Sequence, residues 1–513
     1  MNPKDKAGPD TPSSDYVAMQ PHWYKVKTVL AGLDALKAAG TTFLPQYEDE
    51  PQARYDFRLA TAKLTNIYWD IVDNLSRRPF ANPVTLKEET ADDLARTLEK
   101  NVDNRGTDMH TFAQEMFFDG INNAIDWILV DYPKTDVDPN APRRSVADEE
   151  AAGLRPYWRR YSADEVIAVY SDFQPNGEEV LTHIRMLEWE KQVVDFKEVK
   201  IKRVRQFERL KNDKDGTFGP PQYILWEERK KEHSDEKEWV MIEGPKTLTI
   251  PVIPMVPFIT GQRVNKKGWR FNPPMKSALD LQIDHYQQES GLKNVKGLAC
   301  YPMLAGNKVH PEIDENDKPV PLTVGPQAVL YAPEGQWSIL EPGATSMTFL
   351  SNDIKNTAKE IRELGRQPLT AQSGNLTVIT TAFAAEKGNS AIQNWALAMR
   401  YTLERAWELT NLWMKSDRVV EVNVSLNFDT SYGEDQSFSS VVELGTGDDP
   451  VISREWVIHE GKRRGILDPD WDEEEDMDKL LKQVAGDPAE ESDDSTDEGG
   501  RPEGEEENET QDD

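Results

Sequence analysis

The chain offers few residues whose types and spacing suit catalysis. Cys300 is its only cysteine and stands beside Tyr301 and Pro302, without a His or Lys pattern that would activate a thiol. We therefore interpret it as a buried structural residue rather than a nucleophile. A single cysteine also excludes an intrachain disulfide, which favours a reducing compartment.

Oxygen-rich stretches are the candidates for a cation site. The stretch "HPEIDEND" brings together five potential ligands, which are His310, Glu312, Asp314, Glu315 and Asp317. It lacks the glycine and the distant glutamate of a calcium loop, so a solvated turn is the favoured interpretation. The sequence holds no phosphate-binding loop, dinucleotide fingerprint, HExxH or paired CxxC motif. We predict no catalytic residue, no metal site, no cofactor and no enzymatic activity.

The charged residues of "SNDIKNTAKEIRELGR", residues 351–366, have a spacing that suits pairing between proteins. At about 100° per residue, a helix sorts them into an apolar stripe (Leu350, Ile354, Ala358, Ile361), a basic flank (Lys355, Lys359, Arg362, Arg366) and an acidic flank (Asp353, Glu360). An ordinary surface helix needs only one apolar stripe and a mixed polar back. A second copy of the same helix fits against such flanks, whereas the plainer alternative is a solvated helix with pairs four residues apart.

The composition of the whole chain limits the number of its domains and the kinds of partner it can bind. A chain of 513 residues with 14 Trp, 16 Phe and 15 Tyr can form two to four packed domains. Its net charge of −32 lies mostly in the stretch 468–513, where 22 acidic residues face three basic ones. Affinity for nucleic acid comes mainly from Lys and Arg, so we expect any contact with DNA to be glancing. No signal peptide and no apolar run long enough to cross a membrane are expected.

The first half of the chain divides into a helical and a β-rich part. Residues 1–20 read as a flexible arm, and helical spacing predicts helices over 22–39 and 53–75 and a third over 107–133. After a linker, residues 155–260 alternate as an antiparallel sheet. Asn176-Gly177 and Asp215-Gly216 mark two of its hairpin turns.

Helical spacing returns in the second half of the chain. "PPMKSALDLQIDHYQQESGLKNVKG" predicts a helix, a small β segment follows over 301–341, and then comes the charged helix. A break rich in Thr precedes a long helix over 389–415, whose Trp and Tyr residues follow the core periodicity. "RVVEVNVSLNF" alternates as a strand, residues 435–482 suggest short helices, and the remaining residues are solvated and acidic.

This order of elements resembles the core of tailed-phage portal proteins, where a stem helix leads to a clip, a second stem helix returns, and a tunnel loop precedes a long helix. The resemblance is carried also by "FLPQYEDEPQARYDFRLATAKLTNIYWDIVDNLSRRPF" and by "IKNTAKEIRELGRQPL" followed by "TA". These stretches look like a group of phage portal or capsid-associated proteins long catalogued as a domain of unknown function. The similarity spans most of residues 20–435, and the acidic tail falls outside it.

The resemblance implies an α+β, phage-portal-like fold with a helical and β-rich wing, a helical stem, a small β clip and a short helical crown. On this pattern the chain divides into an arm (1–20), helical wing (21–150), β-rich wing (151–270), outgoing stem (271–298), clip (299–345), returning stem (346–366), tunnel loop (367–388), long wing helix and strand (389–434), crown (435–483) and disordered acidic tail (484–513).

The resemblance also implies a portal protein, a homo-oligomeric, dodecameric ring at one capsid vertex through which double-stranded DNA is packaged and ejected without sequence specificity. The implied partners are the terminase large subunit, a head-completion or adaptor protein and the major capsid protein, with no membrane. The protein is then expected in the virion, and in the host cytoplasm during assembly. An acidic channel suits this role because it denies DNA continuous phosphate contacts.

Two groups of residues are expected to act in such a ring. The tunnel loop would touch DNA through uncharged side chains and a flexible glycine, which are Gln372, Ser373, Gly374, Asn375 and Thr377. The charged flanks of residues 351–366 would join neighbouring subunits, or the basic flank would line the channel. The alternatives are a buried connection in place of the loop, a head-tail adaptor or minor capsid protein in place of a portal, and an enzyme with an unrecognised site in the β-rich part.

Overall fold

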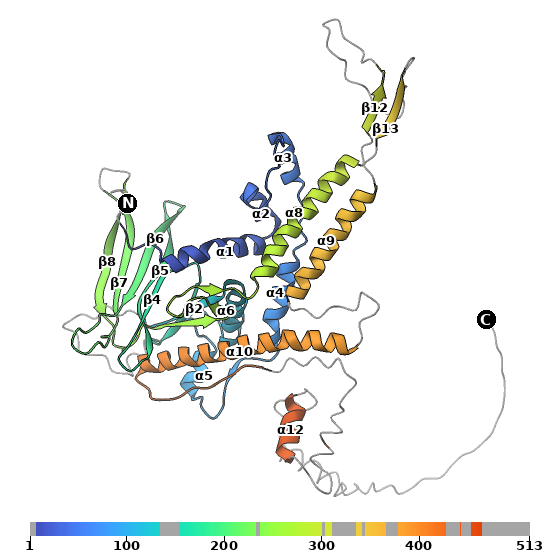
Figure 1. The fold of residues 1–513 in the computed structure, drawn as a ribbon. Helices are drawn as coiled ribbons and strands as arrows, with labels where there is room; N and C mark the ends of the chain where they lie inside the picture. Colours follow the sequence, from blue (N-terminus) through green and yellow to red (C-terminus); the bar gives the residue numbers. More distant parts are fainter. Residues whose placement is uncertain are drawn as a thin grey trace, which may run out of the picture. The chain divides into compact units, whose positions relative to one another are not determined.

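The computed structural model describes residues 7–133, 153–231, 236–299, 303–309, 335–340, 344–365, 378–426, 442 and 453–463. The chain divides into two compact units, residues 1–430 and 431–513. The described part of the second unit holds one helix, α12 (Arg454–Arg463), within the stretch predicted to form short helices. All further elements belong to the first unit, which mixes α and β structure (Figure 1).

Helices dominate the beginning of the first unit. They are α1 (Ser14–Leu30), α2 (Leu33–Ala39), α3 (Gln52–Ala60), α4 (Ile67–Arg77), α5 (Asp93–Glu99) and α6 (Met109–Asn123), with short 3₁₀ turns at Gly40–Thr42 and Arg78–Phe80. Four of them start at a residue whose side chain accepts a hydrogen bond from a backbone N–H of the first turn, namely Ser13, Asn66, Asp92 and Asp108. Such caps satisfy N–H groups that have no partner inside the helix.

The structure corrects four predictions in this region. The helix expected over 107–133 ends at Asn123, because Ala124 takes a left-handed backbone conformation (φ 74°) and strand β2 (Ile125–Asp131) follows. The helix expected over 22–39 is divided between α1 and α2, and the helix expected over 53–75 is divided into α3 and α4. The arm expected over 1–20 is shorter, because α1 begins at Ser14 and Arg185 donates to the carbonyl oxygen of Pro9 (2.9 Å).

Two antiparallel sheets follow. In the first, β2 lies between β3 (Tyr157–Ser162) and β9 (Met255–Ile259). The second has the order β4–β5–β6–β7–β8, with strands Val166–Phe173, Glu179–Val194, Lys197–Glu208, Gln222–Lys230 and Lys237–Thr247. The predicted antiparallel sheet and its turns are confirmed, since Gly177 (φ 85°) lies between β4 and β5 and Gly216 (φ 71°) between β6 and β7. Two small pairs join β1 (Thr85–Leu86) to β14 (Val422–Asn423) and β10 (Gln262–Arg263) to β11 (Phe271–Asn272).

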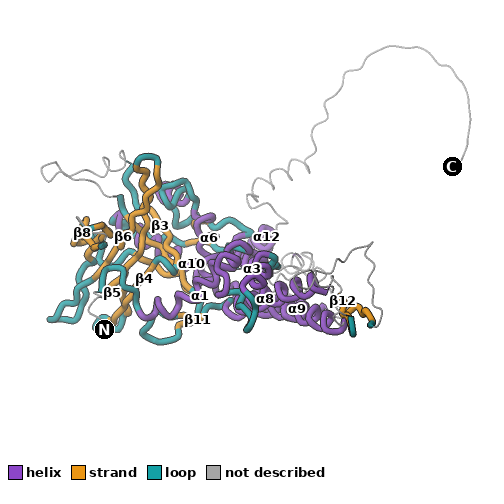
Figure 2. Tube along the Cα trace, turned by 90° about the horizontal axis from the view of Figure 1, so that it is seen from above, coloured by secondary structure: helices purple, strands orange, loops and turns teal. Residues whose placement is uncertain are grey.

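A helical hairpin leaves this body. Helix α8 (Lys276–Ala299) leads out, strands β12 (Met303–Asn307) and β13 (Gln336–Leu340) pair antiparallel at its tip, and α9 (Ala344–Leu364) returns alongside α8. Figures 1 and 2 both show α8 and α9 side by side, extending away from the five-stranded sheet. The two predicted helices and the small β segment between them are confirmed.

The long helix α10 (Val378–Met414) packs along β9 and against α6, and it lies below the hairpin in the view of Figure 1. It begins eleven residues earlier than predicted, so residues 378–388, expected in the tunnel loop, are helical. Its buried side chains include Trp395, Met399, Leu403 and Trp407, which confirms the Trp residues as packing residues, whereas Tyr401 is exposed. Among the described residues 418–426 of the strand expected after α10, Val422 and Asn423 are those that pair with another strand.

Candidate functional site

The hairpin of α8 and α9 is the candidate functional site, and its base is anchored in the main core. Leu279, Ile283 and Tyr286 of α8 are buried in the same hydrophobic cluster as Tyr68 and Ile71 of α4. Each fully buried large apolar side chain stabilises the fold by about 1.5 to 3 kcal/mol. The base of the hairpin is therefore part of the body of the protein rather than an appendage.

Buried polar groups fix the direction in which α8 leaves this body. The carboxylate of Glu289 accepts hydrogen bonds from Lys63 Nζ (2.8 Å), Thr65 N (2.8 Å) and Thr65 Oγ1 (2.9 Å). The amide of Gln282 accepts from Tyr68 N and donates to the carbonyl oxygen of Thr65, each at 3.0 Å. These directional bonds tie the connection between α3 and α4 to α8, where apolar contacts alone would permit sliding.

Sequence reasoning missed these anchoring residues, although a signal for them was present. Gln282, His285 and Glu289 recur at the helical spacing of the buried face of α8, in positions where apolar residues would be expected. His285 Nδ1 lies 3.8 Å from Glu289 Oε2. Burial lowers the pKa of His285, although the neighbouring Glu289 acts in the opposite direction.

Helix α9 buries the predicted apolar stripe only in part. Ile361 is fully buried and Ala358 packs against the core, whereas Leu350 is exposed nearer the tip. At the end of α9 the backbone of Gly365 lies close to α4. A Cβ on Gly365 would lie only 2.6 Å from Ile71 Cδ1. The helix is thus held at its base by the core, and its apolar stripe becomes more exposed towards the tip.

The predicted flanks of α9 are exposed, and the contacts they make within the chain are few. Lys359 Nζ lies 3.7 Å from Glu363 Oε1, and Arg362 donates to the carbonyl oxygen of Ala358 at 3.4 Å. Lys355 and Glu360 are exposed, and Asp353 accepts from Gln288 Nε2 at 3.3 Å. The Lys359–Glu363 pair is of the kind expected for a solvated helix, so pairing between copies stays a prediction.

Several predicted residues lie outside the described residues. They are Arg366 of the basic flank, the tunnel-loop residues Gln372, Ser373, Gly374, Asn375 and Thr377, and the candidate thiol and cation ligands Cys300, His310, Glu312, Asp314, Glu315 and Asp317. The residues 484–513 of the acidic tail also lie outside them.

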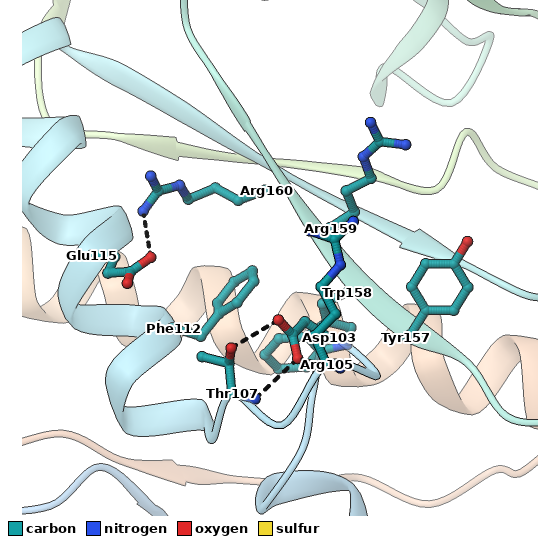
Figure 3. A pocket seen from close by; sticks show the side chains of 9 residues that line it. All are labelled: Asp103, Arg105, Thr107, Phe112, Glu115, Tyr157, Trp158, Arg159 and Arg160. Carbon is teal, nitrogen blue, oxygen red and sulfur yellow. Dashed lines mark hydrogen bonds and ion pairs between the residues drawn. The ribbon is translucent and has the colours of Figure 1, made fainter. Parts of the chain in front are cut away.

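The alternative function, an enzyme with a site in the β-rich part, would need a cavity there. A cavity of about 320 Å³ lies beside β3 and α6 (Figure 3). Both of its carboxylates are bound: Glu115 accepts from Arg160 (3.3 Å), and Asp103 accepts from the N–H and hydroxyl groups of Thr107. Burial raises the pKa of Asp103, but hydrogen bonds from the backbone N–H of Arg105 and from Thr107 outweigh it and hold this pKa below its ordinary value. Burial raises the pKa of Tyr157 to about 12, so its phenol is protonated near neutral pH.

Among the described residues that line this cavity, no nucleophile is hydrogen-bonded to a base. Within the described ranges, no three His, Cys, Asp or Glu side chains are placed to hold a metal ion. None of the helices there is long and apolar enough to span a membrane.

Comparison with known proteins places a family match on the candidate site. A family model described as a domain of unknown function (DUF4055) matches residues 274–414, the stretch that contains the hairpin and α10. No curated protein matches the chain.

Similar chains occur in solved structures of gene transfer agent (GTA) particles. One belongs to the virion of a native GTA particle, with 11% identity, a TM-score of 0.35, and coverage of 80% of this chain and 91% of the other. Another belongs to the neck of an empty GTA particle computed with C6 symmetry, with 10% identity, a TM-score of 0.39, and coverage of 79% of this chain and 90% of the other. A third belongs to the neck of a native GTA particle computed with C12 symmetry, with 11% identity, a TM-score of 0.39, and coverage of 76% of this chain and 88% of the other. TM-scores below 0.5 do not establish a common fold.

Proposed function

We propose that the chain is the subunit of a portal ring, the channel at one vertex of a tailed-phage capsid through which DNA is packaged and ejected. The observation that carries the proposal is the antiparallel hairpin of α8 and α9, with the β12–β13 pair at its tip and α10 after it. This is the order of stem, clip, stem and long helix that the sequence resemblance implies. The anchored base of the hairpin supports it, because a channel wall needs a fixed direction.

The flanks of α9 supply the contacts between subunits in this proposal. A closed ring with cyclic symmetry joins two different patches of each subunit, head to tail. The exposed basic flank (Lys355, Lys359, Arg362) and acidic flank (Asp353, Glu360) are two such patches of opposite charge.

The channel and the ends of the ring define its other partners. Double-stranded DNA passes a predominantly acidic protein without binding tightly, and the uncharged tunnel loop touches it. The terminase large subunit, a head-completion or adaptor protein and the major capsid protein contact the ring from outside. The chain itself performs no catalysis.

Negative-stain electron microscopy of the purified full-length protein tests this function. We expect dodecameric rings with a central opening. A protein that stays monomeric at all concentrations favours the adaptor or minor capsid alternative. Nuclease and ATPase assays, with and without divalent metal, should show no turnover. Turnover that is lost in Glu115→Gln, a residue of the cavity in Figure 3, favours an enzyme instead.

A further inference from the structure

A second cavity, of about 380 Å³, opens where α8, α9 and the segment between α2 and α3 meet. Its walls include Gln288, Gly291 and Leu292 from α8, Asp353 and Ile354 from α9, and Tyr47 from the segment. We call it the stem pocket. It lies on the acidic flank of α9, since Asp353 belongs to that flank.

The Tyr47 wall of the stem pocket is held in place by buried charges. Arg58 is 1% exposed, and it donates to both carboxylate oxygens of Glu50 (2.9 and 2.7 Å) and to the carbonyl oxygen of Pro45 (2.7 Å). Its guanidinium lies 4.1 Å from the centre of the Tyr47 ring. Tyr47 is nevertheless 58% exposed. An aromatic side chain fixed on a buried support and open to solvent is suited to binding a further group.

Two acceptors of the stem pocket, on Gln288 and Asp353, lack matching donors. Gln288 Oε1 is buried and has no hydrogen-bond partner. The Asp353 carboxylate receives one long bond from Gln288 Nε2 (3.3 Å) and, among the residues that the structure describes, forms no ion pair. A buried acceptor left unpaired costs about 1 to 3 kcal/mol. A cationic N–H donor would satisfy both groups, and the apolar wall of Leu292 and Ile354 suits an alkyl chain.

We propose that the stem pocket receives the side chain of Lys355 from the neighbouring copy in the ring, an inference that rests on the portal function proposed above. In a ring with cyclic symmetry all copies stand at the same height. When the hairpin stands along the ring axis, Lys355 is therefore level with the neighbour's Asp353, because two residues rise only about 3 Å along a helix. The alkyl chain of Lys355 crosses the apolar wall, and its ammonium group meets Asp353, Gln288 and the face of Tyr47.

The remaining charges of the two flanks match at a second level. Lys359 lies about 9 Å and Arg362 about 13 Å along the helix from Asp353, whereas both lie within about 3 Å of the level of Glu360. The acidic flank thus offers a pocket at one level and an exposed carboxylate at the other. This arrangement assigns Lys355, rather than Lys359 or Arg362, to the stem pocket.

Disulfide trapping tests the inference directly. In a Cys300→Ser background, Asp353→Cys combined with Lys355→Cys should give, on mild oxidation, a ladder of linked chains on denaturing gels. The two side chains point to different flanks of one helix, so they cannot link within a chain. As a matched control, Asp353→Cys combined with Lys197→Cys, an exposed residue of β6, should give no ladder.

Charge reversal gives a second readout. Lys355→Glu and Asp353→Lys should each raise the protein concentration needed for rings by about tenfold, and the double variant should recover part of the loss. Tyr47→Phe should assemble normally, whereas Tyr47→Ser should not, because only the former keeps the aromatic wall. If wild-type rings form but no ladder appears and Lys355→Glu assembles normally, the pocket inference is wrong while the portal proposal stands. If the wild type forms no rings at all, the portal proposal itself fails.

Discussion

At the residue scale, Asp126 lies in an environment that is unfavourable to its charge. It lies in β2, fully buried, and neither of its carboxylate oxygens has a hydrogen-bond partner. Arg160 Nε is 3.8 Å away, but that guanidinium also pairs with Asp119 (2.9 Å). Burial, together with the nearby Asp119 and Glu165, raises the pKa of Asp126 well above its ordinary value, and Arg160 offsets only part of this rise. The carboxyl is therefore neutral in the fold at pH values where an exposed aspartate is ionised.

This environment predicts a specific pH dependence of stability. The unfolded chain ionises Asp126 above about pH 4 and the folded chain only at higher pH, so the free energy of unfolding falls as pH rises between these two values. We expect Asp126→Asn to raise the free energy of unfolding at about pH 8 by about 1 kcal/mol or more, and to have little effect near about pH 4. One pKa unit corresponds to about 1.4 kcal/mol.

Denaturant unfolding across this pH range measures the effect. Asp172→Asn is the control with the opposite sign, because a hydrogen bond from Lys211 lowers the pKa of that exposed carboxyl. Its replacement should therefore cost stability above the pKa of the unfolded chain. An Asp126→Asn variant that is less stable than the wild type at every pH would contradict this account.

At the scale of elements, the sequence predicts the helices and turns that are determined by a local pattern of residues. Helix α9 has an apolar stripe between charged flanks over several turns, and Asn176-Gly177 and Asp215-Gly216 supply left-handed glycines to two turns of the five-stranded sheet. Strand β2 escapes prediction because every residue except Asp131 is buried, which removes the alternation of a half-exposed strand. Its pairing with β3 and β9 and the left-handed backbone of Ala124 distinguish it from a continuation of α6.

The candidate site is predictable to a similar extent. The charges on α9 follow from spacing along one helix, so the sequence is sufficient to find both flanks. The stem pocket is not predictable, because Tyr47, Gln288 and Asp353 are brought together only by the packing of α8 and α9 against the segment before α3. The early start of α10 is hidden by a stretch rich in Thr, which has a weak preference for helices.

The second level of the α9 flanks, where Lys359 and Arg362 of one copy face Glu360 of the next, gives a separate prediction. Arg362→Glu and Glu360→Lys should each weaken the ring, since each places like charges opposite one another across the interface, and the double reversal should recover part of the loss. Sedimentation velocity of the three variants measures this. Intact rings in all three, with defects only in DNA packaging, would instead support a basic flank that lines the channel.

At the scale of the whole molecule, charge and architecture point to the same role. The chain carries a net charge of −32, and the hairpin leaves a body whose core includes helices α4, α6, α8 and α10. A wall formed from such hairpins would present a fixed surface to DNA and few sites that hold phosphate. The central claim is therefore that the hairpin, rather than the sheets, surrounds the channel.

A cryo-electron microscopy reconstruction of the purified full-length assembly tests this claim most directly. We predict a dodecameric ring in which α8 and α9 of each subunit line the channel, with the β12–β13 pairs gathered at one end. The five-stranded sheets should lie at the periphery. A closed ring whose channel is lined by the sheets, with the hairpins on the outside, would contradict the account, as would an assembly without a channel.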